Sequence, residues 1–567
     1  MTSYADISER FFHYLQSDVD TSVGLGLTDK LALLGDPSLA AHQQSVIAAE
    51  ALLAKVNGAE ISAGNFYELL DIDLIKLHLQ QDLFFKTLTI DGKPQRRLKP
   101  GGVDGISAGI FQLFVNDERS EPERLQDILA RVKLAPAYLE QELHVLTQPV
   151  KRWLDIEVAQ AEGLPELFDN ILDWAKSFKF SDMAALQTAT TQLKHAIVAY
   201  ISRLKSLPTT HNFAIGMDKL EQLLALKKID KTPEQLRQMA ADYMCSTATS
   251  IETLRQNLVT KYQLDTDTTP AQLHNFLNKR FTVQLKDGEL SSVLDIYSAE
   301  KSKILDFIQS SNLFPLPFDQ DMKILQTPNF LQSVIPAGAM WPPLALREGT
   351  QKSLVYLTLK EDELDEHTHL GIPVMMIHEG IPGHHLQFAS AALQPSLIRR
   401  IFSACEHAEG WTTMLEDYML DIGYVADNLV DEVRFIAKRE ISRLVARVGI
   451  DLYFMSGDKQ FLNVGLELEF NANDPFENAA LLLQTATGFT DGRVQAELNW
   501  YSTEQGYPLS YLTGNRMVWQ LKSDLQTANK KQLSQAELDQ EFHRIYLQSG
   551  CMPVSLLREV YRHEGLL

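Results

Sequence analysis

Three histidines and one glutamate lie within a single short segment of the 567-residue chain. Residues 378–387 read HEGIPGHHLQ, which is close to the H-E-x-x-H pattern of zinc hydrolases without matching it. In that pattern, two histidines four positions apart bind one metal ion, and the glutamate between them polarises a water molecule on the metal. The segment therefore indicates a metal site in which His378 is a ligand and Glu379 is the general base.

The second histidine comes six or seven residues after His378, at His384 or His385. On a regular helix, six residues rotate by about 600°, which points His384 away, and seven residues add about 10 Å of rise, which carries His385 too far along the axis. Pro382 and Gly383 can interrupt the helix, because proline lacks an N–H and glycine tolerates unusual dihedral angles. A two-residue bulge would bring His384 to an effective spacing of four, and His385 stays as the alternative.

A carboxylate from another helix would complete the site and leave one metal position open, as catalytic zinc sites do. Ser396 is a typical cap for a new helix, so we expect Glu409 on a second helix that folds back. Glu416 lies seven residues further on nearly the same face, where it could orient a ligand histidine. The residues predict one Zn²⁺ per chain, bound by His378, His384 and Glu409, and this ligand set favours zinc over other divalent ions.

Two other patterns are interpreted as unrelated to the site. Gly105–Gly109 reads GISAG and fits the G-x-S-x-G pattern of serine hydrolases, but that elbow needs a buried strand before the serine. The residues before it form a polar, glycine-rich segment in a helical region. His367 and His369 lie in an acidic, loop-like segment, and we predict that both are solvent-exposed.

Amphipathic helices dominate the first 320 or so residues, and strand signals are scarce there. A proline-rich break over residues 314–343 predicts two domains, an N-terminal helical lobe at 1–335 and a C-terminal helical catalytic lobe at 336–567 that carries the metal site. Residues 353–360 are rich in β-branched and aromatic side chains, which predicts a small β element near 350–360. Its strand could pair with a peptide as a free edge, or belong to a structural hairpin. Apolar residues return every three or four positions most clearly in Leu69–Leu83, Leu125–Leu146, Met183–Leu204 and Met239–Val259.

Composition excludes several classes of function. Hydrophobic residues make up 45% and charged residues 22%, as in ordinary globular proteins. The formal net charge of −22 at pH 7 argues against nucleic acid as a partner, and no apolar run is long enough to cross a membrane. Three scattered cysteines suggest neither a disulfide framework nor a cysteine zinc site. With no signal-peptide pattern at the N-terminus, we expect a cytoplasmic location; the oligomeric state stays open.

The motif segment His378–Gln387 resembles the HEGxPGHHxQ signature of the bacterial family known as domain of unknown function 885. Three further segments are similar to that family's EGW box, its LSYxxG box and its closing segment, so the resemblance is specific over residues 370–567. The family is similar to helical gluzincins such as angiotensin-converting enzyme, the thimet oligopeptidases and dipeptidyl peptidase III. This resemblance implies a mainly α, gluzincin-like (oligopeptidase-like) fold, large and two-lobed around a cleft. The three segments are Glu409–Trp411, Leu509–Gly514 and Ser549–Leu557.

The resemblance also implies roles for individual residues. It favours His384 as the second metal ligand, and Glu409, 25 positions later, has the spacing of the third ligand in the thimet and converting enzymes. It implies that Tyr511 stabilises the tetrahedral oxyanion, a role that contributes on the order of 10²–10³ in rate. The chain departs from the family pattern around the ligands, since Arg447 and Asp451 stand where an aspartate and a histidine are usual.

These observations predict a zinc-dependent hydrolase, a metallopeptidase that cleaves short peptides with a metal-activated water. Glu379 is the expected general base, and Tyr511 the expected oxyanion donor. Two alternatives remain, both compatible with the altered surroundings of the ligands. One is a catalytically degenerate zincin that acts as a binding module, and the other is a metal amidase or esterase that acts on a non-peptide small molecule.

Overall fold

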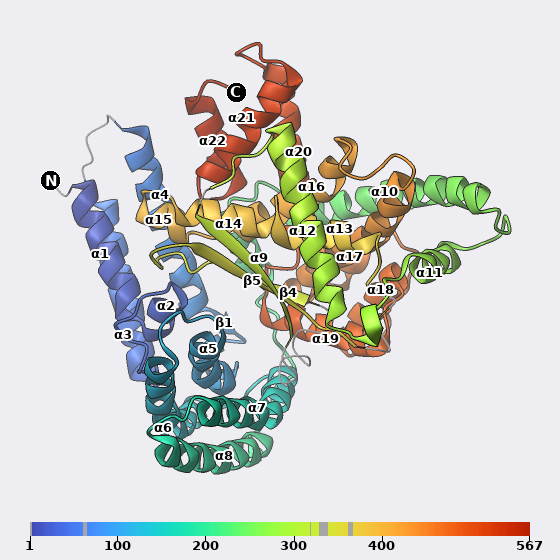
Figure 1. Cartoon of the computed structure of the whole chain (residues 1–567). Helices are drawn as coiled ribbons and strands as arrows, with labels where there is room; N and C mark the ends of the chain where they lie inside the picture. The colour runs from blue at the N-terminus through green and yellow to red at the C-terminus, as the bar shows by residue number, and fades with distance from the viewer. Residues whose placement is uncertain (1–2, 60–64, 318, 328–337, 361–363, 365–366) are drawn as a thin grey trace. The chain divides into compact units, whose positions relative to one another are not determined.

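The computed structural model describes residues 3–59, 65–317, 319–327, 338–360, 364 and 367–567. It is built mainly of α-helices with one small three-stranded sheet, as the sequence predicts (Figure 1). The chain divides into two compact units, here called unit 1 (Met1–Ile215 with Leu344–Arg347) and unit 2 (Gly216–Pro343 with Glu348–Leu567). The domain boundary expected between residues 335 and 336 lies outside the described residues, and the units change at Ile215/Gly216.

Unit 1 consists of helices and one short hairpin. Figure 1 shows α7 and α8 lying side by side, and α8 also packs along α6. The elements are α1 (Tyr4–Ser17), α2 (Val19–Gly24), α3 (Leu39–Asn57), α4 (Phe66–Thr87), β1 (Thr89–Ile90), β2 (Lys93–Pro94), α5 (Gly102–Val115), α6 (Glu121–Val145), α7 (Lys151–Ser177) and α8 (Met183–Ser206).

The GISAG segment lies inside helix α5, and the strand that precedes this helix, β2, is short and exposed, which agrees with the interpretation of the segment as unrelated to serine hydrolases. A Cβ at Gly109 would come 2.2 Å from Nη1 of Arg131, so the glycine lets α6 approach closely.

A buried carboxylate lies on α7. Oε1 of Glu157 accepts hydrogen bonds from the amide of Val103 and the hydroxyl of Tyr200, both at 2.8 Å. Burial raises the pKa of this carboxyl to about 7.

Unit 2 contains the remaining helices and the sheet. Within the described residues, no helix combines the length and apolarity needed to span a bilayer. The elements are α9 (Met217–Leu226), α10 (Pro233–Tyr262), α11 (Pro270–Phe281), α12 (Ser292–Ser311), β3 (Gln320–Gln326), β4 (Gly338–Trp341), β5 (Gln351–Leu357), α13 (Gly371–Met375), a π-helical turn (Met376–Gly380), α14 (His384–Ala392), α15 (Leu397–Ile401), α16 (Cys405–Asp421), α17 (Val430–Ser456), α18 (Pro475–Thr487), α19 (Asp491–Thr503), α20 (Ser510–Ala528), α21 (Gln535–Gln548) and α22 (Val554–His563).

Local sequence signals account for many of these helix ends. The four amphipathic stretches predicted from periodicity lie in α4, α6, α8 and α10. Helix α10 begins with a capping box, in which the hydroxyl of Thr232 accepts from the amide of Gln235 and the glutamine side chain bonds back to the Thr232 amide. Pro233 occupies the first helical position, where its missing N–H costs no helical hydrogen bond.

The small sheet confirms the predicted β element but not its proposed free edge. Its strand order is β3-β5-β4, with β5 parallel to β3 and antiparallel to β4. Residues Leu354–Leu357 of β5 are therefore paired within the chain on both backbone edges, because they lie between β3 and β4. The expectation that this strand could pair with a peptide is wrong, and its role in the site is structural.

Helices α16 and α20 form the close helix pair of unit 2. At their contact, a Cβ on Gly410 would come 2.5 Å from the backbone of Gly514, and one on Gly514 would come 2.0 Å from the carbonyl oxygen of Glu406. Both positions need glycine because any side chain would force the backbones apart. The neighbouring Trp411 is fully buried, so α16 is fixed in position immediately beside Glu409.

Candidate metal centre

The motif segment forms two helical pieces with a break between them, where the sequence predicts one bulged helix. The π-helical turn ends at Gly380, Ile381 is extended, and α14 begins at His384. A Cβ at Gly383 would come 2.0 Å from the carbonyl oxygen of His378, so only glycine fits at the break. The break turns the side chain of His384 towards Glu409, as the predicted bulge was expected to do.

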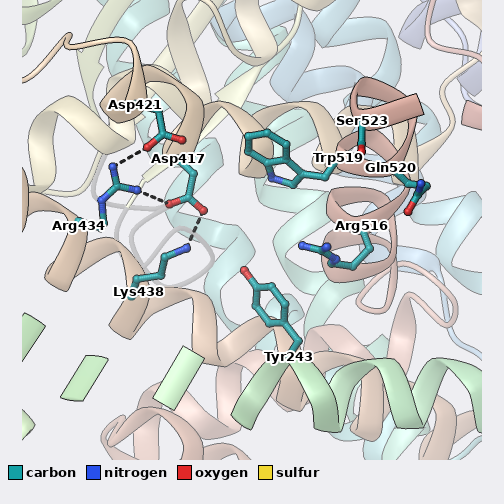
Figure 2. A pocket seen from close by; sticks show the side chains of 9 residues that line it. All are labelled: Tyr243, Asp417, Asp421, Arg434, Lys438, Arg516, Trp519, Gln520 and Ser523. Carbon is teal, nitrogen blue, oxygen red and sulfur yellow. Dashed lines mark hydrogen bonds and ion pairs between the residues drawn. The ribbon is translucent and has the colours of Figure 1, made fainter. Parts of the chain in front are cut away.

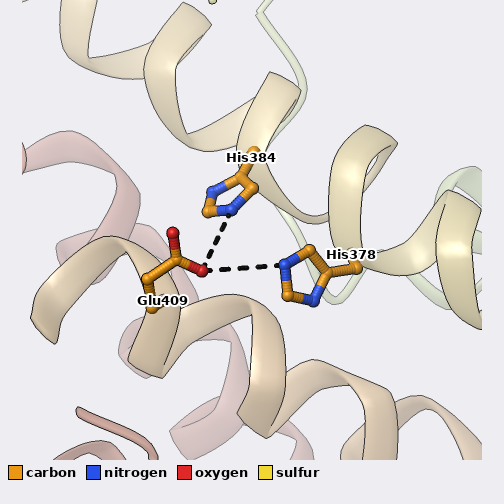
Figure 3. A group of neighbouring side chains, drawn as sticks. All are labelled: His378, His384 and Glu409. Atoms are coloured by element: carbon orange, nitrogen blue, oxygen red, sulfur yellow. Dashed lines mark ion pairs between the residues drawn. The ribbon is translucent and has the colours of Figure 1, made fainter. Parts of the chain in front are cut away.

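His378, His384 and Glu409 meet in space (Figure 3). Nε2 of His378 lies 3.7 Å from Oε2 of Glu409, and Nε2 of His384 lies 3.5 Å from the same oxygen. One ligand atom from each of the three residues lies within 4.8 Å of the others. Ligands about 2.0–2.2 Å from a tetrahedral zinc ion are separated by about 3.4 Å, so this cluster is close to the size that zinc needs.

Two outer contacts orient these side chains. Nδ1 of His378 is 2.7 Å from Oε1 of Glu416, the residue predicted to orient a histidine. When Nδ1 donates to that carboxylate, the lone pair of Nε2 points towards the cluster. The hydroxyl of Tyr507 donates to Oε1 of Glu409 at 2.7 Å, which leaves Oε2 for the two histidines.

The unmatched polar atoms of the cluster fit a bound cation. Oε2 of Glu409 is buried and makes no hydrogen bond within the described residues, although Nε2 of each histidine faces it. An unpaired buried carboxylate oxygen is costly, and a metal ion between it and the imidazoles would remove that cost. The chemistry of this donor set therefore fits zinc.

The charges around the cluster also favour a cation. Burial lowers the pKa of His378, but contacts with Glu409 and Glu416 and the charge of Glu379 outweigh it and raise this pKa to about 10. Burial raises the pKa of Glu409, and the two histidines more than reverse this, so the net value is well below the usual range. The pocket thus holds excess negative charge, which either protons on the imidazoles or a bound metal ion can neutralise.

Helix α16 positions Glu409 differently from the expectation. Ser396 does cap a helix, but this is the short helix α15, and Glu409 lies on the separate helix α16 that begins at Cys405. Trp411 connects α16 to the motif, because its Nε1 donates to the carbonyl oxygen of Pro382 at 2.9 Å. The break and the third candidate ligand are therefore held together by one buried hydrogen bond.

His385 is occupied elsewhere. Its Nδ1 lies 2.7 Å from Oγ of Ser353 on β5, and its Nε2 lies 2.6 Å from Oε1 of Gln320 on β3. Burial lowers the pKa of this imidazole to about 4, so it is neutral. The structure brings His384, and not His385, to the cluster, while His385 fixes α14 to the sheet.

The two residues assigned to catalysis lie beside the cluster. Glu379 is half-buried, and its carboxylate makes no hydrogen bond within the described residues. Tyr511, also half-buried, packs against Tyr507 with ring centroids 5.9 Å apart. Burial is the main cause that raises the pKa of Tyr511 well above its usual value, and the charge of Glu409 adds to it. Its hydroxyl is therefore protonated and can donate.

Sequence reasoning missed Tyr507, which contacts Glu409 directly. No local pattern singles it out, because Tyr507 lies in the loop between α19 and α20. The loop that carries Tyr507 is held by Asp451, whose buried carboxylate accepts from the amides of Gly506 and Leu509, each at 3.0 Å. Asp451 is thus a positioning residue.

The prediction that both histidines of the acidic segment are exposed is wrong for one of them. His367 is only 8% exposed, because its Nδ1 lies 3.1 Å from the hydroxyl of Tyr297 on α12 and its ring packs against that tyrosine. His369 is exposed, as expected. Neither residue joins the metal cluster.

A separate cavity of about 470 Å³ lies at the other end of α16 (Figure 2). Asp417 on its wall forms ion pairs with Lys438 at 2.7 Å and Arg434 at 3.4 Å. None of the metal-cluster residues lines it. The side chains that line the cavity are those of Tyr243, Asp417, Asp421, Arg434, Lys438, Arg516, Trp519, Gln520 and Ser523.

The sequence matches, over residues 19–560, the family described as "Bacterial protein of unknown function (DUF885)". The chain belongs to this family. Two solved structures are similar to this DUF885 chain, both of candidate lipoproteins. The one from Shewanella oneidensis, of unknown function, is 19% identical with a TM-score of 0.75, over 99% of this chain and 100% of that one. The one from Colwellia psychrerythraea is 14% identical with a TM-score of 0.77, over 99% of each chain. These likenesses establish the fold alone, and none of the curated proteins matches the sequence.

Proposed function

We propose that this DUF885 chain is a zinc-dependent hydrolase, and specifically a metallopeptidase that acts on short peptides. One observation carries the proposal: two imidazole Nε2 atoms converge on a buried carboxylate oxygen of Glu409 that has no hydrogen bond within the described residues. Two histidines and one glutamate, with a fourth position left open, are a ligand set of catalytic zinc sites.

The residues around the cluster supply the remaining chemistry. His378, His384 and Glu409 would hold the zinc ion, which would supply a Lewis acid for a carbonyl group and lower the pKa of water. Glu379 accepts the proton of the attacking water and passes it to the leaving amine, since its carboxylate is not engaged elsewhere in the described structure. Tyr511 donates to the oxyanion that develops on the substrate.

The choice of peptides rests on the resemblance of the DUF885 family to helical gluzincins such as the thimet oligopeptidases. The same arrangement of acid, base and Lewis acid can also hydrolyse other amides and esters. A comparison of peptide, amide and ester substrates is therefore part of the test.

The test begins with elemental analysis of protein purified without added metal. We expect about one zinc ion per chain in the wild type, and loss of the metal in both His384→Ala and Glu409→Ala. The variant Glu379→Gln should keep its zinc and lose at least about 10²-fold in hydrolysis of a random peptide library, followed by mass spectrometry.

The outcomes separate the candidate functions. A wild-type protein that neither contains zinc nor takes it up contradicts the proposal. Bound zinc without turnover of peptides, amides or esters would support a non-catalytic binding module instead. Cleavage of amides or esters but not of peptides would keep the metal chemistry and change the substrate.

A further inference from the structure

Helix α17 carries a row of three arginines, Arg439, Arg443 and Arg447, at a spacing of four residues. Residues at this spacing share one helix face. The last of them, Arg447, borders the side chains next to the metal cluster. The guanidinium of Arg447 lies 4.3 Å from the ring centre of Tyr511 and 5.1 Å from that of Trp500. The row thus ends beside Tyr511, the residue that we propose stabilises the oxyanion.

Within the described residues, the donors of Arg443 and Arg447 are only partly satisfied. Arg443 makes no hydrogen bond within the described residues: its Nη1 is 3.8 Å from Glu440 and 3.9 Å from Glu497, and its Nε is buried without a partner. Arg447 donates through Nε to the hydroxyl of Tyr501 and through Nη2 to Glu497, both at 3.0 Å, and its Nη1 makes no hydrogen bond within the described residues. A buried guanidinium N–H without an acceptor, such as Nε of Arg443, is costly, so an acceptor from outside the chain is expected here.

The side chain of Tyr511 connects the arginines to the cluster. The guanidinium of Arg447 lies 4.3 Å from the ring centre of Tyr511, and this ring packs against that of Tyr507 with centroids 5.9 Å apart. The hydroxyl of Tyr507 in turn donates to Glu409, so a chain of contacts runs from the arginines to the cluster. A substrate that reaches from one to the other needs an anionic group only a short distance from its reacting carbonyl.

The arginine pair can be reached from solvent. The side chain of Arg443 is 23% exposed and that of Glu497 is 16% exposed, whereas Arg447 behind them is 6% exposed. Guanidinium groups bind carboxylates through two parallel N–H donors. The row therefore presents a partly buried carboxylate site beside the reacting centre.

We propose that Arg443 and Arg447 bind the free C-terminal carboxylate of the substrate, so that the preferred substrates are short peptides with an unblocked C-terminus. The cut would then fall near that end. The cleavage rests on the proposed hydrolase function, but the carboxylate site itself does not. It is assigned from unmet hydrogen-bond donors, exposure and placement.

Equilibrium dialysis tests the site without needing turnover. The Glu379→Gln protein is dialysed against tripeptides of random sequence, supplied as free acids and as C-terminal amides, and the retained peptides are measured by mass spectrometry. We expect the free acids to bind about 10–100-fold more tightly than the amides, because each charge-assisted hydrogen bond lost to the amide weakens binding. Arg443→Gln in the same background should bring this ratio close to one.

The matched control is Arg544→Gln, which removes a positive charge from α21 where Arg544 pairs with Glu541 on the surface. This control should keep the full preference for free acids. Equal retention of acids and amides, or no retention of either, overturns the proposal. If Arg443→Gln does not fold, the ratio in the parent protein still decides. Peptide retention is measured apart from zinc content and hydrolysis. An inactive or metal-free protein that still prefers free acids would therefore contradict the hydrolase proposal and support the carboxylate site.

Discussion

The carboxylate of Glu416 holds one ligand of the proposed zinc site, so its replacement should weaken zinc binding without touching a ligand. Its Oε1 lies 2.7 Å from Nδ1 of His378, on the side of the ring opposite Glu409. A carboxylate in this place fixes the tautomer of the histidine and raises the basicity of its metal-binding nitrogen. Glu416→Gln keeps an acceptor of the same shape and removes the charge, whereas Glu416→Ala removes both.

Loss of such an outer contact typically costs 10–100-fold in metal affinity, or about 1.4–2.7 kcal/mol. We expect Glu416→Gln to fall near the lower limit, because its amide oxygen still accepts from His378. We expect Glu416→Ala to fall near the upper limit, because burial leaves Nδ1 without another acceptor in the described structure.

The assay is a competition titration of zinc against a chromogenic chelator at about neutral pH, with wild type and variants in parallel. Asp417→Asn is the matched control: Asp417 is the next residue on α16, but its carboxylate pairs with Lys438 and Arg434 and not with a histidine. The reasoning is refuted if both Glu416 variants bind zinc within about twofold of the wild type. It is equally refuted if Asp417→Asn loses as much affinity as they do.

Two further predictions concern stability. Gly410→Ala should lower the free energy of unfolding by about 2 kcal/mol or more, because its Cβ would come 2.5 Å from the backbone of Gly514. The control Gly492→Ala, whose Cβ would have no atom within 4 Å, should be neutral or slightly stabilising. Equal changes of the melting temperature in the two variants would contradict the prediction. For Glu157, burial raises the pKa from 4.5 in the unfolded chain to about 7 in the folded protein, so the unfolded state loses its proton first as the pH rises. The free energy of unfolding therefore falls between these two pH values, and above pH 7 it is about 3 kcal/mol lower than below pH 4.5. Glu157→Gln keeps the acceptor Oε1, and denaturant titrations at about pH 5 and pH 8 should show a weaker loss than in wild type; an unchanged loss would exclude Glu157 as its source.

Local patterns determine much of this chain. Periodicity over residues 183–204 predicts α8, which runs from Met183 to Ser206. The β-branched run predicts the strand observed at Gln351–Leu357. In the motif, residue types select His378 and then His384 or His385, because proline and glycine between the histidines prevent a regular helix, and the family resemblance supports His384 and Glu409.

Other features depend on contacts between segments that are far apart in the sequence. Tyr507 reaches Glu409 across 98 positions, and His385 reaches Gln320 across 65. The pairing of both edges of β5 and the change of unit at Ile215/Gly216 are likewise set by which elements pack together. The sequence by itself determined the helices and a short list of candidate ligands, since these follow from the intrinsic preferences of neighbouring residues. Only the tertiary structure decided which polar groups share a buried site, because burial and hydrogen bonding join residues that no local pattern connects.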